Sequence, residues 1–67
     1  MISLTINGTP RTFARALNCA ELIRELDLAG KRIAMERNGE IVPRSQFAQC
    51  ILQDGDRLEI VVAVGGG

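Results

Sequence analysis

The sequence contains no histidine, no tryptophan and no tyrosine, and its formal net charge is zero. Its two cysteines, Cys19 and Cys50, form no CxxC pair, so a zinc site made from the usual ligands is not expected. Eight basic residues balance eight acidic ones, which leaves no net field to attract nucleic acid or an anionic membrane. We therefore predict no metal, no nucleic acid and no membrane among its partners.

Long hydrophobic runs are missing as well. No apolar stretch approaches the ~20 residues that a membrane-spanning helix needs. Residues 1–6 lack the basic flank and the cleavage site of a signal peptide. The expected location is the cytoplasm, where the two cysteines are expected to stay reduced. We assign neither cysteine a chemical role.

The chain has the composition of a small folded domain. It is 67 residues long, 46% hydrophobic and 24% charged, which is typical of a globular rather than a disordered protein. A chain of this length makes one domain, because a shorter piece would be too small to bury a core. We expect the globular part to cover residues 1–64 and a flexible glycine tail to cover residues 65–67.

The N-terminal residues alternate between apolar and polar, as in a strand with one buried face, and the apolar ones are Ile2, Leu4 and Ile6. Residues 7–10 then contain a residue that tolerates positive φ and a proline that is expected to end the pairing. A second strand is predicted near residues 11–13. The opening element is therefore a predicted β-hairpin.

A helix is predicted to begin at Asn18. Asn18 and Glu21, three residues later, resemble a capping box at a helix start. Apolar residues then recur at helical spacing in a single stripe: Cys19, Leu22, Ile23 and Leu26. Cys19 is therefore expected to be a small core residue. Gly30 is predicted to end the helix, after about ten residues, in a left-handed conformation.

Asn38-Gly39 is the strongest two-residue signal for a type I′ turn, and it predicts a hairpin between Ile33–Arg37 and Glu40–Val42. Pro43 cannot donate to a ladder and is expected to end it, before a short turn or 3₁₀ segment that buries Phe47. A loop at residues 54–56 precedes the last predicted strand, whose core residues are Leu58, Ile60 and Val62.

The predicted order is hairpin, helix, hairpin and final strand. One helix covers one face of a small mixed sheet, and a right-handed crossover lets a later strand lie parallel to the first. The expected fold is α+β and of β-grasp (ubiquitin-like) type. Its mixed sheet is expected to have four to five strands, with one main helix packed on one face.

Gly65-Gly66-Gly67 follows directly after the last apolar strand. Glycine has no Cβ, so such a backbone can enter a narrow cleft and approach a phosphate or a nucleophile closely. The Gly67 carboxylate, with a reference pKa of ~3.3–3.7, is ionised near neutrality. It is able to attack the α-phosphate of ATP, giving an acyl-adenylate that a sulfur nucleophile displaces. The alternative interpretation is a frayed tail without function.

Four segments in order match the pattern of one known family: the strand that ends at Ile6-Asn7-Gly8, residues 36–44, the loop at 54–56 with the strand after it, and Gly66-Gly67. They resemble the ThiS family of thiamine-biosynthesis sulfur carriers, and the match runs nearly end to end. Only Gly66 and Gly67 correspond to the family's functional positions. Gly65 extends the pair to three, which we expect to lengthen the thread without altering the reactive group.

The resemblance implies a protein cosubstrate rather than an enzyme, with no catalytic residue of its own. A ThiF-like adenylyltransferase, which uses ATP and magnesium, is implied to activate Gly67, while this chain binds no cofactor. Sulfur from a cysteine desulfurase or another persulfide donor then makes a thiocarboxylate on Gly67. A ThiG-like thiazole synthase is the implied acceptor.

Val61 and Ala63 alternate away from the core set of the last strand and are expected to be at least partly exposed. With Val64 they are candidate docking residues for the partner enzymes, and Gly65 and Gly66 are the thread that enters a partner's active site. Ordinary packing is the alternative, since single exposed apolar residues are normal.

Three other functions share these features. They are the small subunit of molybdopterin synthase (MoaD-like), a ubiquitin-like interaction module with an inert tail, and conjugation to target lysines through the same carboxylate. The shortness of the chain and residues 38–44 favour the sulfur carrier of thiamine biosynthesis.

Overall fold

The sheet has five strands in the order β2-β1-β5-β3-β4, with β5 in the centre. The computed structural model describes residues 1–63. The elements are β1 (Ile2–Ile6), β2 (Thr9–Phe13), α1 (Cys19–Glu25), β3 (Ile33–Arg37), β4 (Glu40–Val42), the 3₁₀ helix η1 (Arg44–Gln46) and β5 (Arg57–Val62). Strands β1 and β5 are parallel and the other neighbours are antiparallel. The predicted β-grasp fold is confirmed.

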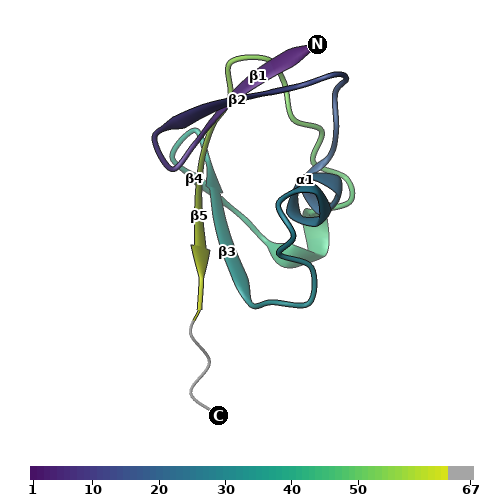
Figure 1. Cartoon of the computed structure of the whole chain (residues 1–67). Helices are drawn as coiled ribbons and strands as arrows, with labels where there is room; N and C mark the ends of the chain where they lie inside the picture. Colours follow the sequence, from purple (N-terminus) through teal and green to yellow (C-terminus); the bar gives the residue numbers. More distant parts are fainter. Residues whose placement is uncertain (64–67) are drawn as a thin grey trace.

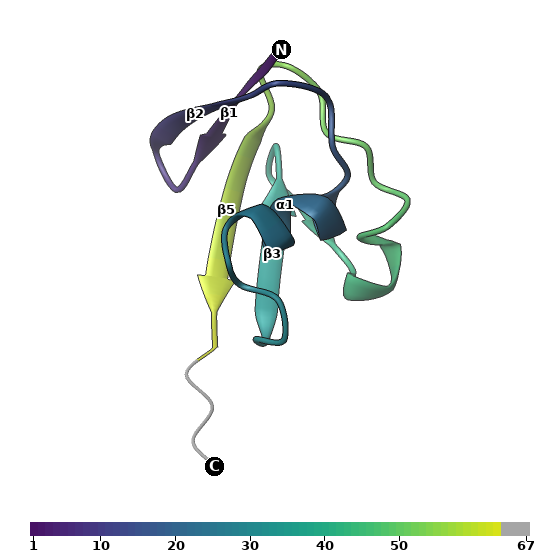
Figure 2. The same ribbon diagram turned by 45° about the vertical axis from the view of Figure 1, so that its right-hand side comes forward.

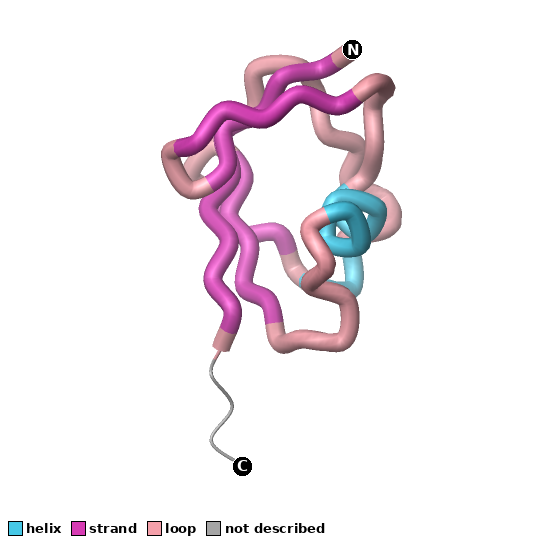
Figure 3. Tube along the Cα trace, viewed as in Figure 1, coloured by secondary structure: helices cyan, strands magenta, loops and turns pink. Residues whose placement is uncertain are grey.

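Helix α1 packs on one face of the sheet, and the other face has no helix among residues 1–63 (Figures 1 and 2). Figure 3 shows the same division by colour, with the magenta strands on one side and the cyan helix on the other. The buried apolar side chains fill the space between these layers, and the most completely enclosed are Leu4, Leu22, Met35, Leu52, Leu58 and Cys19. Cys19 is thus a core residue, as its place in the helical stripe predicts. No helix within residues 1–63 has the length and apolarity to cross a membrane.

The first hairpin differs from its prediction at Pro10. Strand β2 begins at Thr9 rather than near residue 11, and Pro10 pairs with Thr5 inside the ladder. The proline is tolerated because β2 is an edge strand, where half of the N–H groups have no ladder partner. The local rule that proline ends pairing applies to inner strands.

The helix is shorter than predicted, because it ends after Glu25 and not near Gly30. Asp27 adopts the left-handed conformation, with φ of 60°, and its N–H donates to Arg24 O over 3.0 Å. The N–H of Leu28 donates to Ile23 O over 2.9 Å. These two bonds form a Schellman cap, in which aspartate takes the position that glycine usually fills. The capping box of Asn18 and Glu21 is confirmed at the other end.

Both Asn-Gly turns have positive φ at both residues, as type I′ turns require. Their asparagine side chains also hold the central strand. Strand β1 pairs with β5 only as far as Ile6 and Leu58. Beyond that point the Asn7 amide replaces the next peptide group: Oδ1 accepts from Ile60 N–H at 2.7 Å, and Nδ2 donates to Ile60 O at 3.0 Å.

Asn38 holds the beginning of β5 from the other hairpin. Its Oδ1 accepts from Arg57 N–H at 2.9 Å, and its backbone N–H donates to Arg57 O at 2.8 Å. The central strand is therefore fixed by a turn on each side.

Asn7→Gly tests this role of the amide, because glycine keeps the positive φ and removes only the side chain. We expect the free energy of unfolding to fall by about 2 kcal/mol, since two hydrogen bonds to Ile60 are lost. Urea unfolding followed by circular dichroism measures the change. Asn7→Asp keeps an acceptor for the N–H of Ile60 but no donor for its carbonyl. Its free energy of unfolding is expected to lie between those of wild type and Asn7→Gly. Equal free energies of unfolding for all three chains would contradict the role of the Asn7 amide in holding Ile60.

Candidate functional site at the end of the central strand

The candidate site is the region where the chain leaves β5. This strand pairs with β3 along its length, from Leu58 opposite Arg37 to Val62 opposite Ile33. The pairing continues one step further, because Ala63 N–H donates to Arg32 O at 2.9 Å. In Figure 1 the end of β5 lies at the opposite end of the sheet from the N-terminus. Residues after Ala63 therefore continue from a firmly paired central strand.

The predicted reactive residues fall after this point. Val64, Gly65, Gly66 and Gly67 lie outside the described residues, so their predicted roles stay predictions. Val61 and Ala63 are described, and both are exposed on the sheet face opposite α1. Leu58 and Ile60 point the other way and are buried. The alternation predicted for this strand is thus confirmed for Leu58 and Ile60, whereas Val62, predicted as a core residue, is only half-buried.

The exposed face around the end of β5 is partly apolar. Val61, 62% exposed, lies directly opposite Ala34 of β3, which is also exposed. Ile41 of β4 is 77% exposed and lies opposite Glu36. Directly opposite residues share a face of the sheet, so these side chains lie on the outer face with Ala63. We call Ala34, Ile41, Val61 and Ala63 the outer apolar patch.

Two carboxylates lie beside this patch. Glu36 of β3 is directly opposite Glu59 of β5, and both are exposed. Like charges directly opposite each other on a sheet are destabilising. Arg57, two residues from Glu59 on the same strand, is also exposed. The outer face is therefore apolar near the end of β5 and charged nearer its beginning.

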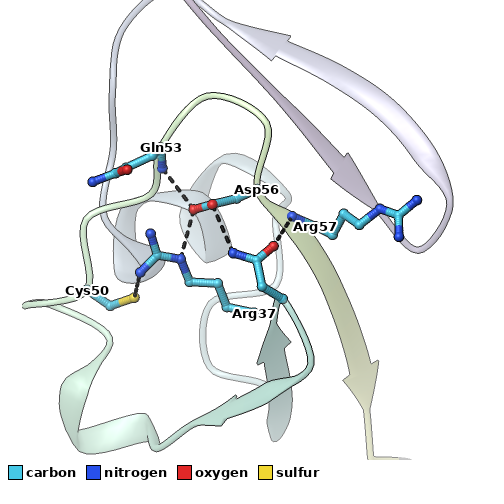
Figure 4. Close-up of polar contacts among 6 residues, drawn as sticks. Arg37, Cys50, Gln53, Asp56 and Arg57 are labelled. Atoms are coloured by element: carbon cyan, nitrogen blue, oxygen red, sulfur yellow. Dashed lines mark hydrogen bonds and ion pairs between the residues drawn. The ribbon is translucent and has the colours of Figure 1, made fainter.

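An ion pair between a buried carboxylate and a half-buried guanidinium fixes the loop that leads into β5. Asp56 is 7% exposed, and its Oδ2 accepts from Arg37 Nε at 2.8 Å and from Gln53 N–H at 2.9 Å. Its Oδ1 accepts from Asn38 Nδ2 at 3.1 Å. Figure 4 shows these contacts converging on the one carboxylate. Burial by itself raises the pKa of Asp56, but the three hydrogen bonds and the positive charge outweigh it and leave that pKa below its ordinary value of 3.8.

Reasoning from the sequence missed this pair, because it assigned residues 54–56 only to a loop. Arg37 and Asp56 are 19 residues apart, and no local pattern connects them. The pair lies at the beginning of β5, since Arg37 is opposite Leu58. The pair is thus at the far end of the strand from Ala63, where it supports the fold.

A model of the ThiS family matches residues 4–67. The chain belongs to the ThiS family. It is 39% identical over 59 residues to the sulfur carrier protein ThiS of Escherichia coli, a match that covers 79% of this chain and 89% of that protein. A crystal structure of a thiamine biosynthesis protein (ThiS) from Geobacter metallireducens superposes with a TM-score of 0.83. That match has 38% identity and covers 98% of this chain and all of the other.

Another relative is much longer. The thiazole synthase of Paramagnetospirillum magneticum is 46% identical to this ThiS-family chain over 66 residues, which are 98% of this chain and 20% of that protein. The thiazole synthase of Magnetococcus marinus matches in the same way, at 30% identity over 66 residues. The chain thus spans about a fifth of the length of these thiazole synthases.

Asp56→Asn tests the charged loop through its pH dependence. In this variant an N–H₂ group replaces one carboxylate oxygen of Asp56 and cannot accept the hydrogen bonds which that oxygen receives. At neutral pH we therefore expect the free energy of unfolding to fall by about 2 kcal/mol. The folded pKa is depressed, so the stability due to the carboxylate is fully present above its unfolded value of 3.8 and is lost as pH falls through the folded pKa. The difference between wild type and variant is therefore expected to shrink below about pH 4.

Chemical unfolding at a series of pH values measures this difference. Asp54→Asn is the matched control in the same loop, because Asp54 is exposed and its Oδ1 accepts from Ser3 N–H, a bond that an amide oxygen can keep. Its stability is expected to stay close to that of wild type. If the difference in free energy of unfolding between wild type and Asp56→Asn stayed constant into strong acid, the stabilising role of the ionised Asp56 carboxylate would be contradicted.

Proposed function

We propose that this chain is a sulfur carrier of thiamine biosynthesis, with the carboxylate of Gly67 as its carrier group. The observation that carries the proposal is the ThiS family match, which continues through residue 67. The described fold supports it, because the chain leaves the central strand next to an exposed apolar patch. The chain is thus a cosubstrate that partner enzymes act on, and we assign the reactions to the cytoplasm.

The proposed chemistry takes place on the chain end. A carboxylate oxygen of Gly67 attacks the α-phosphate of ATP, pyrophosphate leaves, and an acyl-adenylate forms. The outer sulfur of a persulfide replaces AMP on the acyl carbon, and a thiol breaks the persulfide S–S bond by forming a disulfide with its other sulfur, so that the carrier form is a thiocarboxylate. ATP and magnesium belong to a ThiF-like activating enzyme. This chain supplies the carboxylate and a glycine thread without side chains at Gly65 and Gly66.

A thiazole synthase is the proposed acceptor of the sulfur. Two proteins named thiazole synthase contain a segment similar to nearly all of this chain. A carrier domain joined covalently to its acceptor has a high effective concentration there. These relatives support the inference that a separate carrier of the same family serves a ThiG-like synthase.

Both partners need a surface to hold while the thread enters their active sites. Ordering each residue of a flexible segment costs ~1–2 kcal/mol in backbone entropy, so the globular part must contribute binding free energy. The outer apolar patch adjoins the end of β5 and suits this purpose, and Val61 is its large exposed apolar side chain on β5 itself. Glu36 and Glu59 beside it favour a partner surface with basic side chains, which would relieve their mutual repulsion.

Incubation of the chain with a ThiF-type enzyme, ATP and a persulfide donor tests the carrier chemistry. The intact mass is expected to rise by the difference between one sulfur and one oxygen atom, with the change on Gly67. A chain that lacks Gly67 is expected to keep its mass, because the new terminal carboxylate lies one residue too far from the active site.

Three outcomes would contradict this proposal. An unchanged mass with an enzyme that is active on another ThiS protein would exclude the carrier chemistry. A stable link to lysine side chains would indicate conjugation instead. Sulfur transfer to the large subunit of molybdopterin synthase, without transfer to a thiazole synthase, would make the chain a MoaD-like small subunit of molybdopterin synthase instead.

Val61→Glu tests the docking surface. The substitution adds a charge at an exposed position, so the free energy of unfolding is expected to change by about 0.5 kcal/mol or less. Formation of thiocarboxylate at limiting carrier concentration is expected to slow by about tenfold, because a buried charge at an interface costs more than 1 kcal/mol. Mass spectrometry over time measures the rate.

Ile51→Glu is the matched control, since Ile51 is also exposed, at 52%, but belongs to the segment that pairs with Asn18 beside α1. Its rate is expected to equal that of wild type. Equal slowing of both variants would mean that charge, and not the outer apolar patch, determines the rate.

A further inference from the structure

Cys19 and Cys50 are brought together by a short antiparallel bridge. Asn18 pairs with Ile51, while Cys19 N–H donates to Cys50 O at 3.0 Å and Leu52 N–H donates to Leu17 O at 2.9 Å. In this pattern Cys19 and Cys50 lie directly opposite each other. Such residues have Cα atoms about 5.5 Å apart, which is within the range of disulfides, about 4.4–6.8 Å.

The two thiols differ in access and in charge environment. Cys19 is fully buried. Cys50 is half-buried and lines a shallow pocket of about 130 Å³ together with Arg37, Glu40, Ile41, Val42 and Gln46. Arg37 donates from Nη1 to Cys50 Sγ at 3.5 Å, and its own position is held by Asp56 (Figure 4). A small polar molecule therefore reaches the sulfur of Cys50 beside a guanidinium, while Cys19 lies behind it.

We propose that Cys19 and Cys50 form an oxidisable dithiol, in which a hydroperoxide reacts at Cys50 and Cys19 then closes an intramolecular disulfide. This site is separate from the carboxylate chemistry of Gly67. It joins the beginning of α1 to the segment after η1, and of the outer apolar patch only Ile41 lines its pocket.

The reaction balances with the peroxide as the only oxidant. The Cys50 sulfur attacks one peroxide oxygen, the O–O bond breaks, and water leaves with a proton, so that Cys50 becomes a sulfenic acid. The Cys19 sulfur then attacks the Cys50 sulfur, an S–S bond forms, the S–O bond breaks, and the hydroxyl leaves as a second water with the Cys19 proton. Two electrons pass from the two thiols to the peroxide.

The protonation of Cys19 agrees with this order of events. Burial, and secondly the hydrogen bond to Cys50, raise the pKa of Cys19 to about 12. The thiolate is the form that reacts with peroxides. Cys19 is therefore a thiol at neutral pH and is a poor first target, so its part is to attack a neighbouring sulfenic acid.

The test treats the reduced full chain with hydrogen peroxide and follows intact mass and tryptic peptides. The expected product has lost two hydrogens, and its digest contains residues 16–24 linked to residues 45–57. Dithiothreitol is expected to restore the original mass. Because a cross-link restricts the unfolded chain, the oxidised chain is expected to melt at a higher temperature than the reduced chain.

Single variants separate the roles of the two sulfurs. Cys50→Ser is expected to lose its remaining thiol about tenfold more slowly than wild type does, since only a buried thiol is left. Cys19→Ala is expected to stop at a Cys50 sulfenic acid that dimedone traps. If this variant does not fold, the linked peptide of wild type still decides the question.

Several results would overturn the proposal. Disulfide-linked dimers, or a Cys50 sulfinic acid without the linked peptide, would show that Cys19 does not reach Cys50. Equally fast oxidation of Cys50→Ser would show that Cys50 is not the first target.

Discussion

The central strand β5 depends on the two asparagines of the hairpin turns. Asn7 continues the β1 ladder with its side chain, and Asn38 binds the backbone of Arg57 and the carboxylate of Asp56. Strand β1 alone pairs with β5 at only two positions, so the parallel contact would be short without this amide. The fixed strand in turn sets which side chains face α1, which face outward, and where the chain leaves the sheet.

The alternation of β5 divides its side chains between the core and the exposed face of the sheet. Leu58 and Ile60 enter the core, while Val61 and Ala63 lie on the face that α1 does not cover. The ion pair of Arg37 and Asp56 fixes the beginning of the strand, far from its end. The charges that stabilise this strand therefore lie away from the point where the chain leaves the sheet.

The sequence predicted most of the fold because its signals are local. The two Asn-Gly turns, the capping box at Asn18 and the alternation of β1 and β5 each depend on residues within a few positions of one another. Two local rules failed. Proline was expected to end strand pairing, but Pro10 lies inside a ladder because β2 is at an edge. Gly30 was expected to end the helix, but Asp27 ends it because aspartate also tolerates positive φ. The candidate site was predictable only as a strand followed by glycines.

By itself the sequence determined the type and order of the elements, many of the residues that enter the core, and the position of Gly67 after an apolar strand. Only the tertiary structure decided which distant groups meet. Arg37 reaches Asp56, Asn7 reaches Ile60 and Cys19 lies opposite Cys50 because sheet order and register bring them together. Periodicity along a chain is a local property, whereas register is set by the packing of the whole sheet against α1.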